Sequence, residues 1–179
     1  MQPIAIQCVE EYRVDPVQEG RIARLLSRSF PGYPPERTYF MQLPDFRLLA
    51  TWDETLAGHL AAEHRVIAVG GRPHRVFGVA DLCVEGSFRR RKIGTMLLEF
   101  LERMAREARV DFIILIASER PFYLRNGFRS VGNLCRWLAI EDFQTQMIIQ
   151  HGLAGDLLIK PISGKVWGKG LVDFMGAIF

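Results

Sequence analysis

Four consecutive cationic residues, Arg89–Lys92, precede Gly94 and Thr95 where the hydrophobic pattern predicts the start of a helix. The N-terminus of a helix carries backbone N–H groups without intrahelical partners and the positive end of the helix dipole. Such N–H groups, a glycine and fixed positive charges together form a typical site for a phosphate or a pyrophosphate. The sequence therefore predicts a phosphate-binding loop made of Arg89, Arg90, Arg91, Lys92, Ile93, Gly94 and Thr95.

A helix and two strands must position this loop. Apolar residues recur at helical spacing from Ile93 to Ala108, with charged residues on the other face, which predicts an amphipathic helix. The apolar run Phe112–Ile116 is typical of a parallel strand that is covered on both faces. A strand that ends at Val84 precedes the loop, so the order of elements predicts a right-handed βαβ crossover.

The remaining sequence predicts further strands and helices around this unit. Before the loop we expect a strand over 4–14, a helix that begins at Asp15-Pro16, a loop with a short helix from about Pro35 to Leu43, and three antiparallel strands over 47–84 with turns at Asp53-Glu54 and Gly70-Gly71. After it we expect a short helix ended by Asn126-Gly127, a strand over 128–140, a helix over 142–153, a strand over 157–162 and an apolar tail. The predicted class is α/β, with a central, mostly antiparallel sheet, one parallel βαβ pair and flanking helices.

The composition indicates one globular domain that spans residues 1–179. Hydrophobic residues make up 49% of the chain, which is enough for a full core. The formal net charge of +3 is small and concentrated in one loop, which favours a local anion site over a nucleic-acid surface. Three unpatterned cysteines do not indicate disulfides, and we see neither a secretory signal nor an apolar run of about 18 residues. We therefore expect a cytoplasmic protein without a membrane partner.

Motifs of several other enzyme classes do not occur in the sequence. We find no HExxH, no CxxC pair, no GxGxxG after a strand, no P-loop that ends in GKS or GKT, and no GxSxG turn. His59 and His64 are five positions apart on a predicted strand, so their side chains should point to opposite faces. We therefore expect no bound metal.

Two motifs give the stretch from Ala80 to Phe128 a resemblance to the GNAT superfamily of acyl-CoA-dependent N-acyltransferases. The pyrophosphate loop of that family reads Arg/Gln-x-x-Gly-x-Gly/Ala, and Arg89–Gly94 is similar to it, with Lys92 in place of the first glycine. The second motif is Tyr-x-x-x-Gly-Phe, which Tyr123–Phe128 matches. The Pro-Phe-Tyr form of this motif and the apolar tail also resemble, more distantly, the branch that includes aminoglycoside 2'-N-acetyltransferases.

The resemblance implies a GNAT-like fold with acetyl-CoA as co-substrate. It implies that the loop holds the pyrophosphate, and that the pantetheine arm pairs with the strand edge at Leu82, Cys83 and Val84. This pairing requires that strand to splay from the strand at 110–117. A backbone N–H near Cys83 or Val84 would then stabilise the oxyanion. The resemblance also places Tyr123 to protonate the leaving thiolate.

Lys92 departs from the family pattern. If its position requires a positive φ, a lysine there costs about 1 kcal/mol or more in backbone strain. Alternatively, its ammonium group supplements the phosphate contacts.

Acetyl transfer also requires a base, because an alkylamine with a pKa of about 10 is protonated at neutral pH. Asp81 is the nearest acidic candidate, acting directly or through water, and Glu63 on the preceding strand is the reserve. Each candidate has an alternative interpretation. Asp81 could face solvent or pair with an arginine, and Tyr123 could be a core aromatic. Cys83 could be a nucleophile, although a strand cysteine among apolar residues is usually inert.

We therefore predict an acetyl-CoA-dependent N-acetyltransferase that acts on a primary amine of a small molecule by direct transfer in a ternary complex. The alternatives are a non-catalytic module that senses acyl-CoA, a peptide or protein N-acetyltransferase, and an anion- or RNA-binding protein; nucleic acid is the less favoured partner. The apolar tail could pack on the sheet, form part of a homodimer, or line the acceptor pocket. In the last case, the distant resemblance suggests Asp173 and the Phe179 carboxylate as contacts for a cationic acceptor.

Overall fold

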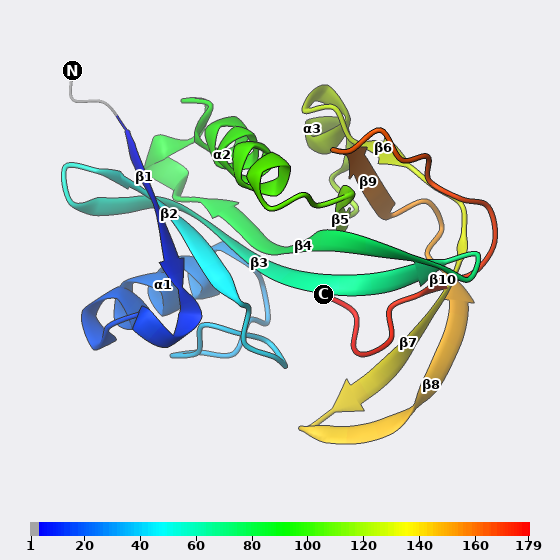
Figure 1. Ribbon diagram of the computed structural model, residues 1–179. Helices are drawn as coiled ribbons and strands as arrows, with labels where there is room; N and C mark the ends of the chain where they lie inside the picture. Colours follow the sequence, from blue (N-terminus) through cyan, green and yellow to red (C-terminus); the bar gives the residue numbers. More distant parts are fainter. Residues whose placement is uncertain (1–3) are drawn as a thin grey trace. The chain divides into compact units, whose positions relative to one another are not determined.

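A mixed ten-stranded sheet with α-helices beside it confirms the predicted fold class (Figure 1). The computed structural model describes residues 4–179. The strand order is β6-β9-β5-β4-β3-β10-β7-β8, and β1 joins the sheet through β2, which pairs with β3. The elements are β1 (Ala5–Glu10), η1 (Glu11–Arg13), α1 (Pro16–Ser29), β2 (Phe46–Trp52), β3 (Thr55–Val69), β4 (Arg72–Val84), η2 (Gly86–Phe88), α2 (Ile93–Glu107), β5 (Phe112–Ile116), α3 (Arg120–Arg125), β6 (Arg129–Ser130), β7 (Leu134–Glu141), β8 (Gln144–Gly152), β9 (Leu157–Pro161) and β10 (Val172–Asp173).

The chain divides into two compact units. Unit 1 contains the residues up to Ala62 together with Ala80–Leu101, and unit 2 contains Glu63–Val79 together with Glu102–Phe179. The strands β3 and β4 and the helix α2 contribute residues to both units.

Two-residue turns connect consecutive strands at three points. In each turn both central residues have a positive φ, as type I′ hairpin turns require. The turns are Asp53-Glu54 between β2 and β3, Gly70-Gly71 between β3 and β4, and Asp142-Phe143 between β7 and β8. The first two confirm the predicted turns.

In unit 1, α1 begins at the predicted position. The Asp15 side chain accepts hydrogen bonds from the backbone N–H groups of Val17 and Gln18, at 2.8 and 2.9 Å. The Gln18 side chain accepts one from the Asp15 backbone N–H at 3.3 Å, which completes a capping box. The apolar side of the helix contributes to a buried cluster that consists of Val9, Ile22, Leu25, Leu26, Tyr33, Leu49 and Cys83.

The first turns of α2 pack closely on β3 because residue 58 is a glycine. A Cβ atom at Gly58 would lie 2.7 Å from Cγ2 of Ile93 and 3.3 Å from Cδ1 of Leu97. Leu49 of the α1 cluster pairs with His59, the neighbour of Gly58, and successive strand residues face opposite ways. The start of α2 and the α1 cluster therefore cover opposite faces of unit 1.

β4 and β5 form the predicted parallel pair. Their register runs from Val76↔Phe112 to Val79↔Leu115, whereas β4 itself continues to Val84. The last segment of β4, residues 80–84, thus extends beyond its ladder with β5. The family resemblance places a splay at this point of the sheet.

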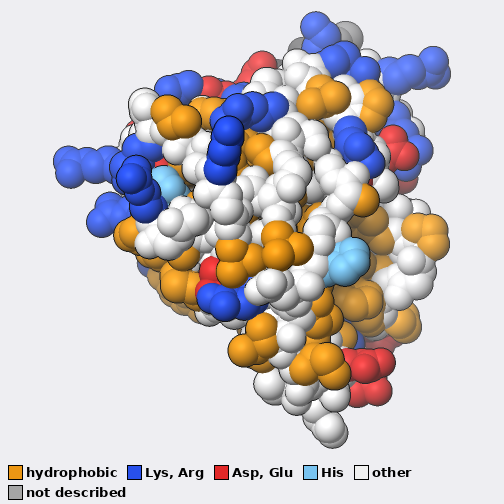
Figure 2. Space-filling model, turned by 90° about the vertical axis from the view of Figure 1, so that its right-hand side faces the viewer, with side chains coloured by type: hydrophobic (Ala, Val, Ile, Leu, Met, Phe, Trp, Pro, Cys, Tyr) orange, Lys and Arg blue, Asp and Glu red, His pale blue; other side chains and the backbone are white. Residues whose placement is uncertain are grey.

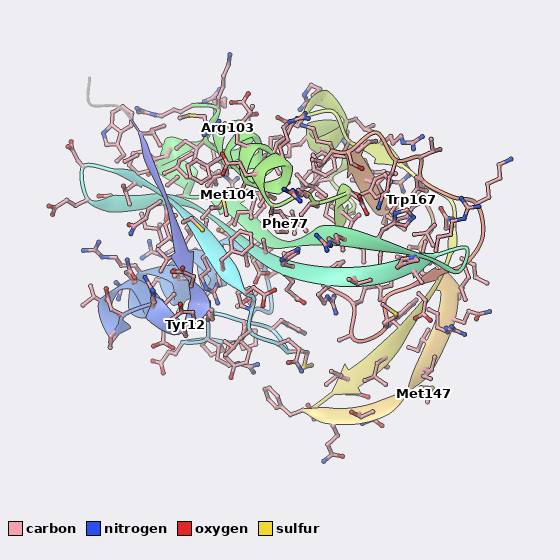
Figure 3. All side chains as sticks on the ribbon, in the orientation of Figure 1. Tyr12, Phe77, Arg103, Met104, Met147 and Trp167 are labelled. Carbon is pink, nitrogen blue, oxygen red and sulfur yellow. The ribbon has the colours of Figure 1, made fainter. Side chains whose placement is uncertain are left out.

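The core of unit 2 forms around β5. This strand lies between β4 and β9, and its residues from Phe112 to Leu115 are buried. The indole ring of Trp167, labelled in Figure 3, packs edge-on against Phe112 with 5.0 Å between the ring centroids. Its Nε1–H donates to Oδ1 of Asn133 at 2.9 Å, so the buried indole is also satisfied.

Two predicted helices are wrong. The short helix expected from about Pro35 to Leu43 is a series of turns and bends. Glu36 has a φ of 60°, which a right-handed helix does not allow, and Pro44 disfavours helical geometry in the residue before it, Leu43. The helix expected over 142–153 is the strand β8, which pairs antiparallel with β7. Its β-branched residues favour a strand, and Asp142-Phe143 carries no typical turn signal.

The C-terminal tail packs on the sheet of unit 2. The ring of Phe179 lies over Gly78, where a Cβ atom would come within 2.1 Å of it. The guanidinium carbon of Arg65 lies 4.1 Å from the same ring centroid, and Nη1 of Arg65 donates to the carbonyl of Ala177 at 2.9 Å. Of the three locations predicted for this tail, the structure shows the one on the sheet.

β10 is part of this tail and adds a second parallel pair to the one predicted. Val172 and Asp173 pair parallel with Cys135 and Arg136 of β7 and antiparallel with β3. The Asp173 carboxylate, which the distant resemblance suggests as an acceptor contact, accepts a 3.1 Å hydrogen bond from Nε of Arg136.

The contact between Gly78 and Phe179 can be tested with a double-mutant cycle. We expect Gly78→Ala to lower the free energy of unfolding by about 1–3 kcal/mol, because the new methyl group must displace the ring. In the Phe179→Ala background the same substitution should cost little. Urea denaturation of the four proteins measures the coupling.

Gly132→Ala is the matched control, because a Cβ atom there has no neighbour within 4 Å. An equal effect of Gly78→Ala in both backgrounds would show that the ring does not lie on Gly78.

Candidate active site

The predicted phosphate-binding loop lies in unit 1, between β4 and α2. The Glu85 side chain accepts a 2.8 Å hydrogen bond from the Gly86 backbone N–H and so caps η2. The helix α2 then begins at Ile93, and the carbonyl of Lys92 accepts the N–H of Met96 at 2.9 Å. Helical geometry provides no intrahelical acceptor for the first N–H groups of α2. The loop and the helix start therefore occupy the predicted positions.

The loop backbone contains two residues of positive φ, separated by one residue. Arg90 and Lys92 have φ values of 64° and 63°, and Arg91 between them is not left-handed. Left-handed residues are one of the two conformations that alternate in an anion-binding nest, in which successive N–H groups turn toward one side. The lysine at the position of the family glycine therefore does adopt a positive φ, and it carries the backbone strain expected for this case.

The side chain of Arg91 lies over two aromatic rings. Its guanidinium carbon is 5.1 Å from the ring centroid of Trp52 and 5.7 Å from that of Phe88. The two rings are themselves 6.2 Å apart. This stack anchors the middle of the loop to the end of β2. The role of Trp52 was missed in the sequence, where it appears only as a strand residue before a turn.

Leu82, Cys83 and Val84 form the end of β4, as predicted. Cys83 is buried in the cluster around α1. Burial raises the pKa of its thiol to about 12. The thiol is therefore neutral near pH 7, which does not suit a nucleophile.

Asp81 has a conformation that is unusual for a strand residue. Its φ is 52°, in the left-handed region. The hydroxyl of Tyr33, from the loop after α1, donates to Oδ2 of Asp81 at 2.8 Å. Burial raises the pKa of Asp81, while the Tyr33 hydrogen bond and the positive charge of Arg47 act in the opposite direction. The carboxyl group is thus held in place by a partner that the sequence did not indicate.

A buried polar network lies behind Asp81 and was also missed in the sequence. Arg47 of β2 is fully buried, and it donates to both carboxylate oxygens of Glu11, at 2.5 and 3.0 Å. Its Nη1 lies 3.0 Å from Nε2 of His59 on β3. Nδ1 of His59 lies 2.9 Å from the backbone carbonyl oxygen of Asp81. The signal in the sequence was an arginine within the apolar strand Phe46–Trp52.

His59 is held in its neutral form. Burial lowers the pKa of His59 to about 3, and the positive charge of Arg47 contributes to the same shift. A neutral histidine has one ring nitrogen that donates and one that accepts. It can therefore connect a donor and an acceptor, as it does here.

Tyr123 lies in unit 2, on α3. Its ring packs against Phe122 and Phe128, with centroid distances of 5.1 and 5.7 Å. Its carbonyl accepts the N–H groups of Asn126 and Phe128, at 2.9 and 3.1 Å. These contacts fix the backbone of the Tyr-x-x-x-Gly-Phe motif, in which Gly127 has a φ of 84°. The structure therefore groups Asp81, the strand 82–84 and the loop in unit 1, and Tyr123 in unit 2.

Glu63, the reserve base, belongs to unit 2 and forms an ion pair with Arg65, with 3.1 Å between Oε2 and Nε. Asp81 belongs to the same unit as the strand end at 82–84 and the loop at 89–95, so it is the better candidate.

Residues 4–179 contain neither a candidate metal site nor a membrane-spanning helix. No group of three or more histidine, cysteine, aspartate or glutamate side chains in residues 4–179 is placed to hold a metal ion. None of the helices in this part of the chain is long and apolar enough to cross a membrane.

Comparisons with known proteins point to one family. The family model of the acetyltransferase (GNAT) domain matches residues 14–131 of this chain. Among solved structures, the GNAT family N-acetyltransferase YhbS from Escherichia coli, in complex with CoA, has a TM-score of 0.67 at 18% identity, covering 97% of this chain and 92% of that chain. A GNAT family acetyltransferase from Brucella melitensis, in complex with acetyl-CoA, has a TM-score of 0.61 at 15% identity and covers 94% of each chain. None of the curated proteins matches this chain in sequence.

The ribosomal-protein-S18-alanine N-acetyltransferase from Escherichia coli has the same fold, with a TM-score of 0.58 at 14% identity, covering 90% of this chain and 97% of that chain. At such identities the likeness concerns the fold, so the family rests on the domain match.

The strain at Lys92 can be measured directly. Lys92→Gly and Lys92→Ala both remove the ammonium group, but only glycine adopts a positive φ without strain. We expect the Lys92→Gly protein to be more stable than the Lys92→Ala protein, with a free energy of unfolding that is higher by about 1 kcal/mol in urea denaturation.

The neighbouring residue Arg89 has a φ of −59°, so Arg89→Gly should show no such gain over Arg89→Ala. A Lys92→Gly protein that is less stable than Lys92→Ala would contradict the left-handed backbone.

Proposed function

Because the chain belongs to the GNAT acetyltransferase family, we propose that it is an acetyl-CoA-dependent N-acetyltransferase that acts on a primary amine of a small molecule. The enzyme class follows from the family, whereas the acceptor and the direct transfer in a ternary complex are our proposals. One observation carries the proposal. Arg90 and Lys92 have positive φ values immediately before the first turn of α2, as the left-handed residues of an anion-binding nest do.

The loop fits the pyrophosphate of coenzyme A. The N–H groups from Arg91 to Thr95 would hold the phosphate oxygens, at the positive end of the α2 dipole. Arg89, Arg90 and Lys92 are exposed and would add positive charge. The stack of Arg91 on Trp52 and Phe88 would keep the loop in shape without a ligand.

The end of β4 fits the pantetheine arm. The ladder with β5 ends at Val79, so the backbone of Leu82, Cys83 and Val84 could pair with an extended chain that carries two amides. A backbone N–H at Cys83 or Val84 would stabilise the negative charge that develops on the carbonyl oxygen. When bound, acetyl-CoA supplies the activated thioester.

Asp81 is our proposed base, directly or through water. An ordinary aspartate with a pKa of about 3.9 is a weak base, and a raised pKa brings it closer to the operating pH. Burial provides this shift, and Tyr33 fixes the direction of the carboxyl group. The same buried carboxylate would attract the ammonium form of the acceptor before deprotonation.

Tyr123 is our proposed acid for the departing thiolate, by the family resemblance. A covalent acetyl-enzyme has little support in this chain, because burial raises the pKa of the Cys83 thiol to about 12. Direct attack of the amine on the thioester needs no such intermediate. The proton from the amine goes to Asp81 or to water, and the thiolate takes a proton from Tyr123.

We propose the edge strand β8 as the surface through which a homodimer would form. It ends the strand order and has no Asp, Glu, Lys or Arg from Gln144 to Gly152. Hydrophobic side chains gather on the lower part of the face in Figure 2, at the height of the β7–β8 hairpin in Figure 1. Met147, labelled in Figure 3, and Ile148 are 64% and 69% exposed. Charged side chains commonly protect an edge strand against pairing with a second copy, and β8 lacks them.

A cytoplasmic location stays a prediction from the sequence.

The proposed function is tested by the release of free thiol from acetyl-CoA. The panel should contain aminoglycosides, polyamines, amino acids and peptide N-termini, with and without the protein. Thiol release that depends on a small amine supports the proposal. Release with peptides alone would favour a peptide or protein acceptor, and binding of CoA without any release would favour a sensing module.

Tyr123 can be tested separately from binding. We expect Tyr123→Phe to lower kcat by about 100-fold, because a general acid typically contributes about 10²–10⁴-fold. The affinity for CoA, measured by calorimetry, should stay the same.

Tyr12→Phe is the control, because Tyr12 is exposed on η1. An unchanged kcat in Tyr123→Phe would remove the tyrosine from the mechanism.

The pairing of Tyr33 with Asp81 predicts a change in pH dependence. Asp81 acts as a base only when ionised, so kcat/KM falls as the pH falls through its pKa. The Tyr33 hydroxyl stabilises the ionised form, and its loss should raise the pKa. Tyr33→Phe should therefore move the acid limb of kcat/KM toward higher pH by about one unit at most, since one hydrogen bond contributes about 1 kcal/mol.

Tyr39→Phe, in the same loop, should leave the acid limb in place, because the ring of Tyr39 stacks on Arg37. A shift toward lower pH in Tyr33→Phe, or none, would contradict the role of Asp81.

A further inference from the structure

The backbone of Asp81 needs support from its surroundings. A left-handed residue is common for glycine and costly for other residues. Within an antiparallel ladder, an isolated left-handed residue acts as a bulge, which bends the strand and redirects a side chain. The bend at Asp81, with its φ of 52°, comes just after the ladder with β5 ends at Val79.

His59 contacts the backbone of this bend. Its Nδ1 lies 2.9 Å from the carbonyl oxygen of Asp81, and its Nε2 lies 3.0 Å from Nη1 of Arg47. The arginine nitrogen can only donate, so Nε2 of His59 must accept. The single proton of the neutral ring therefore sits on Nδ1, which donates to the Asp81 carbonyl.

The surroundings of His59 allow no other position of the ring proton and no second proton. His59 and Arg47 are both fully buried, and they are diagonal neighbours on one face of β2 and β3, because Arg47 pairs with Ala61 and His59 with Leu49. Nε and Nη2 of Arg47 donate to the two carboxylate oxygens of Glu11. These two bonds fix the plane of the guanidinium group and so direct an Nη1–H toward His59. A protonated His59 would place two positive charges about 3 Å apart without water, which is costly.

We propose that His59 is a positioning residue of the acetyltransferase: its Nδ1–H holds the Asp81 carbonyl, and thereby keeps Asp81 in the left-handed conformation from which its carboxyl group reaches Tyr33. This role rests on the proposed function, because it assumes that the Asp81 carboxyl group and the strand end at 82–84 act on substrates. Tyr33 holds the side chain of Asp81, and His59 holds its main chain. Asp81 is therefore held both from the loop after α1 and from β3.

Two conservative variants separate the two contacts of His59. The amide nitrogen of an asparagine takes the place of Nδ1, so His59→Asn keeps a donor for the Asp81 carbonyl. The amide group of a glutamine takes the place of Nε2, so His59→Gln keeps an acceptor for Arg47 and loses the donor. If the donor matters, His59→Asn should retain kcat within about threefold, and His59→Gln should lose about tenfold or more, since a shift of about 1 Å can cost about 100-fold.

The KM for acetyl-CoA should change less than kcat in both variants, because the phosphate-binding loop at 89–95 is not changed. His151→Asn is the control, since His151 is an exposed residue of β8. Equal losses of kcat in His59→Asn and His59→Gln would reduce His59 to a structural residue and overturn the proposal. So would a His59→Gln protein with the kcat of the wild type.

Nitrogen NMR of the wild-type imidazole gives a test that does not depend on turnover. We expect the proton of His59 on Nδ1, and no titration of this ring between about pH 5 and about pH 8, where an ordinary histidine titrates. A proton on Nε2, or a titration near pH 6.5, would overturn the proposal. If the wild type acetylates no amine, the proposed function fails, and the ring spectrum still decides whether His59 holds Asp81.

Discussion

The left-handed conformation of Asp81 is the constraint on which the account of this protein depends. It costs about 1–3 kcal/mol in a non-glycine residue, and it persists only where the surroundings determine it. Here the surroundings are two hydrogen bonds, from the Tyr33 hydroxyl and from the His59 ring, each of about 1 kcal/mol. Behind His59, the buried charge of Arg47 would be strongly destabilising without its two hydrogen bonds to Glu11. The result is a strand end that extends beyond its ladder with β5 and in which the Asp81 carboxyl group has a fixed direction.

A second set of strained residues lies in the same unit, before α2. Arg90 and Lys92 occupy conformations that glycine would adopt without cost. In both places the chain carries a charged residue where a relaxed backbone would favour glycine. A loop that attracts a pyrophosphate would gain from cations, and our proposed base at residue 81 needs an ionisable side chain. The proposed chemistry would therefore account for residues that conformational preference does not favour. The stack of Arg91 on Trp52 and Phe88 shows that the loop is also tied to the sheet through side chains.

Local patterns in the sequence were sufficient for most of the fold. The amphipathic period of α2, the Asp15-Pro16 start of α1 and the turns at Asp53-Glu54 and Gly70-Gly71 each depend on residues that are close in sequence. The segment 35–43 and β8 were predicted as helices because their conformations depend on tertiary contacts and on an unusual Asp-Phe turn. The loop 89–95 could be found from its charges and its glycine. The network of Glu11, Arg47 and His59 could not, because its members are far apart in sequence and only the sheet register brings them together.

The central claim is that the segment from Asp81 to Thr95 is built to hold acetyl-CoA. Calorimetric titration of coenzyme A into the wild-type chain tests this claim most directly. We expect saturable binding at one site per chain, with an affinity that falls as the salt concentration rises, because the cations of the loop are exposed. A titration without saturable binding at any salt concentration would contradict it.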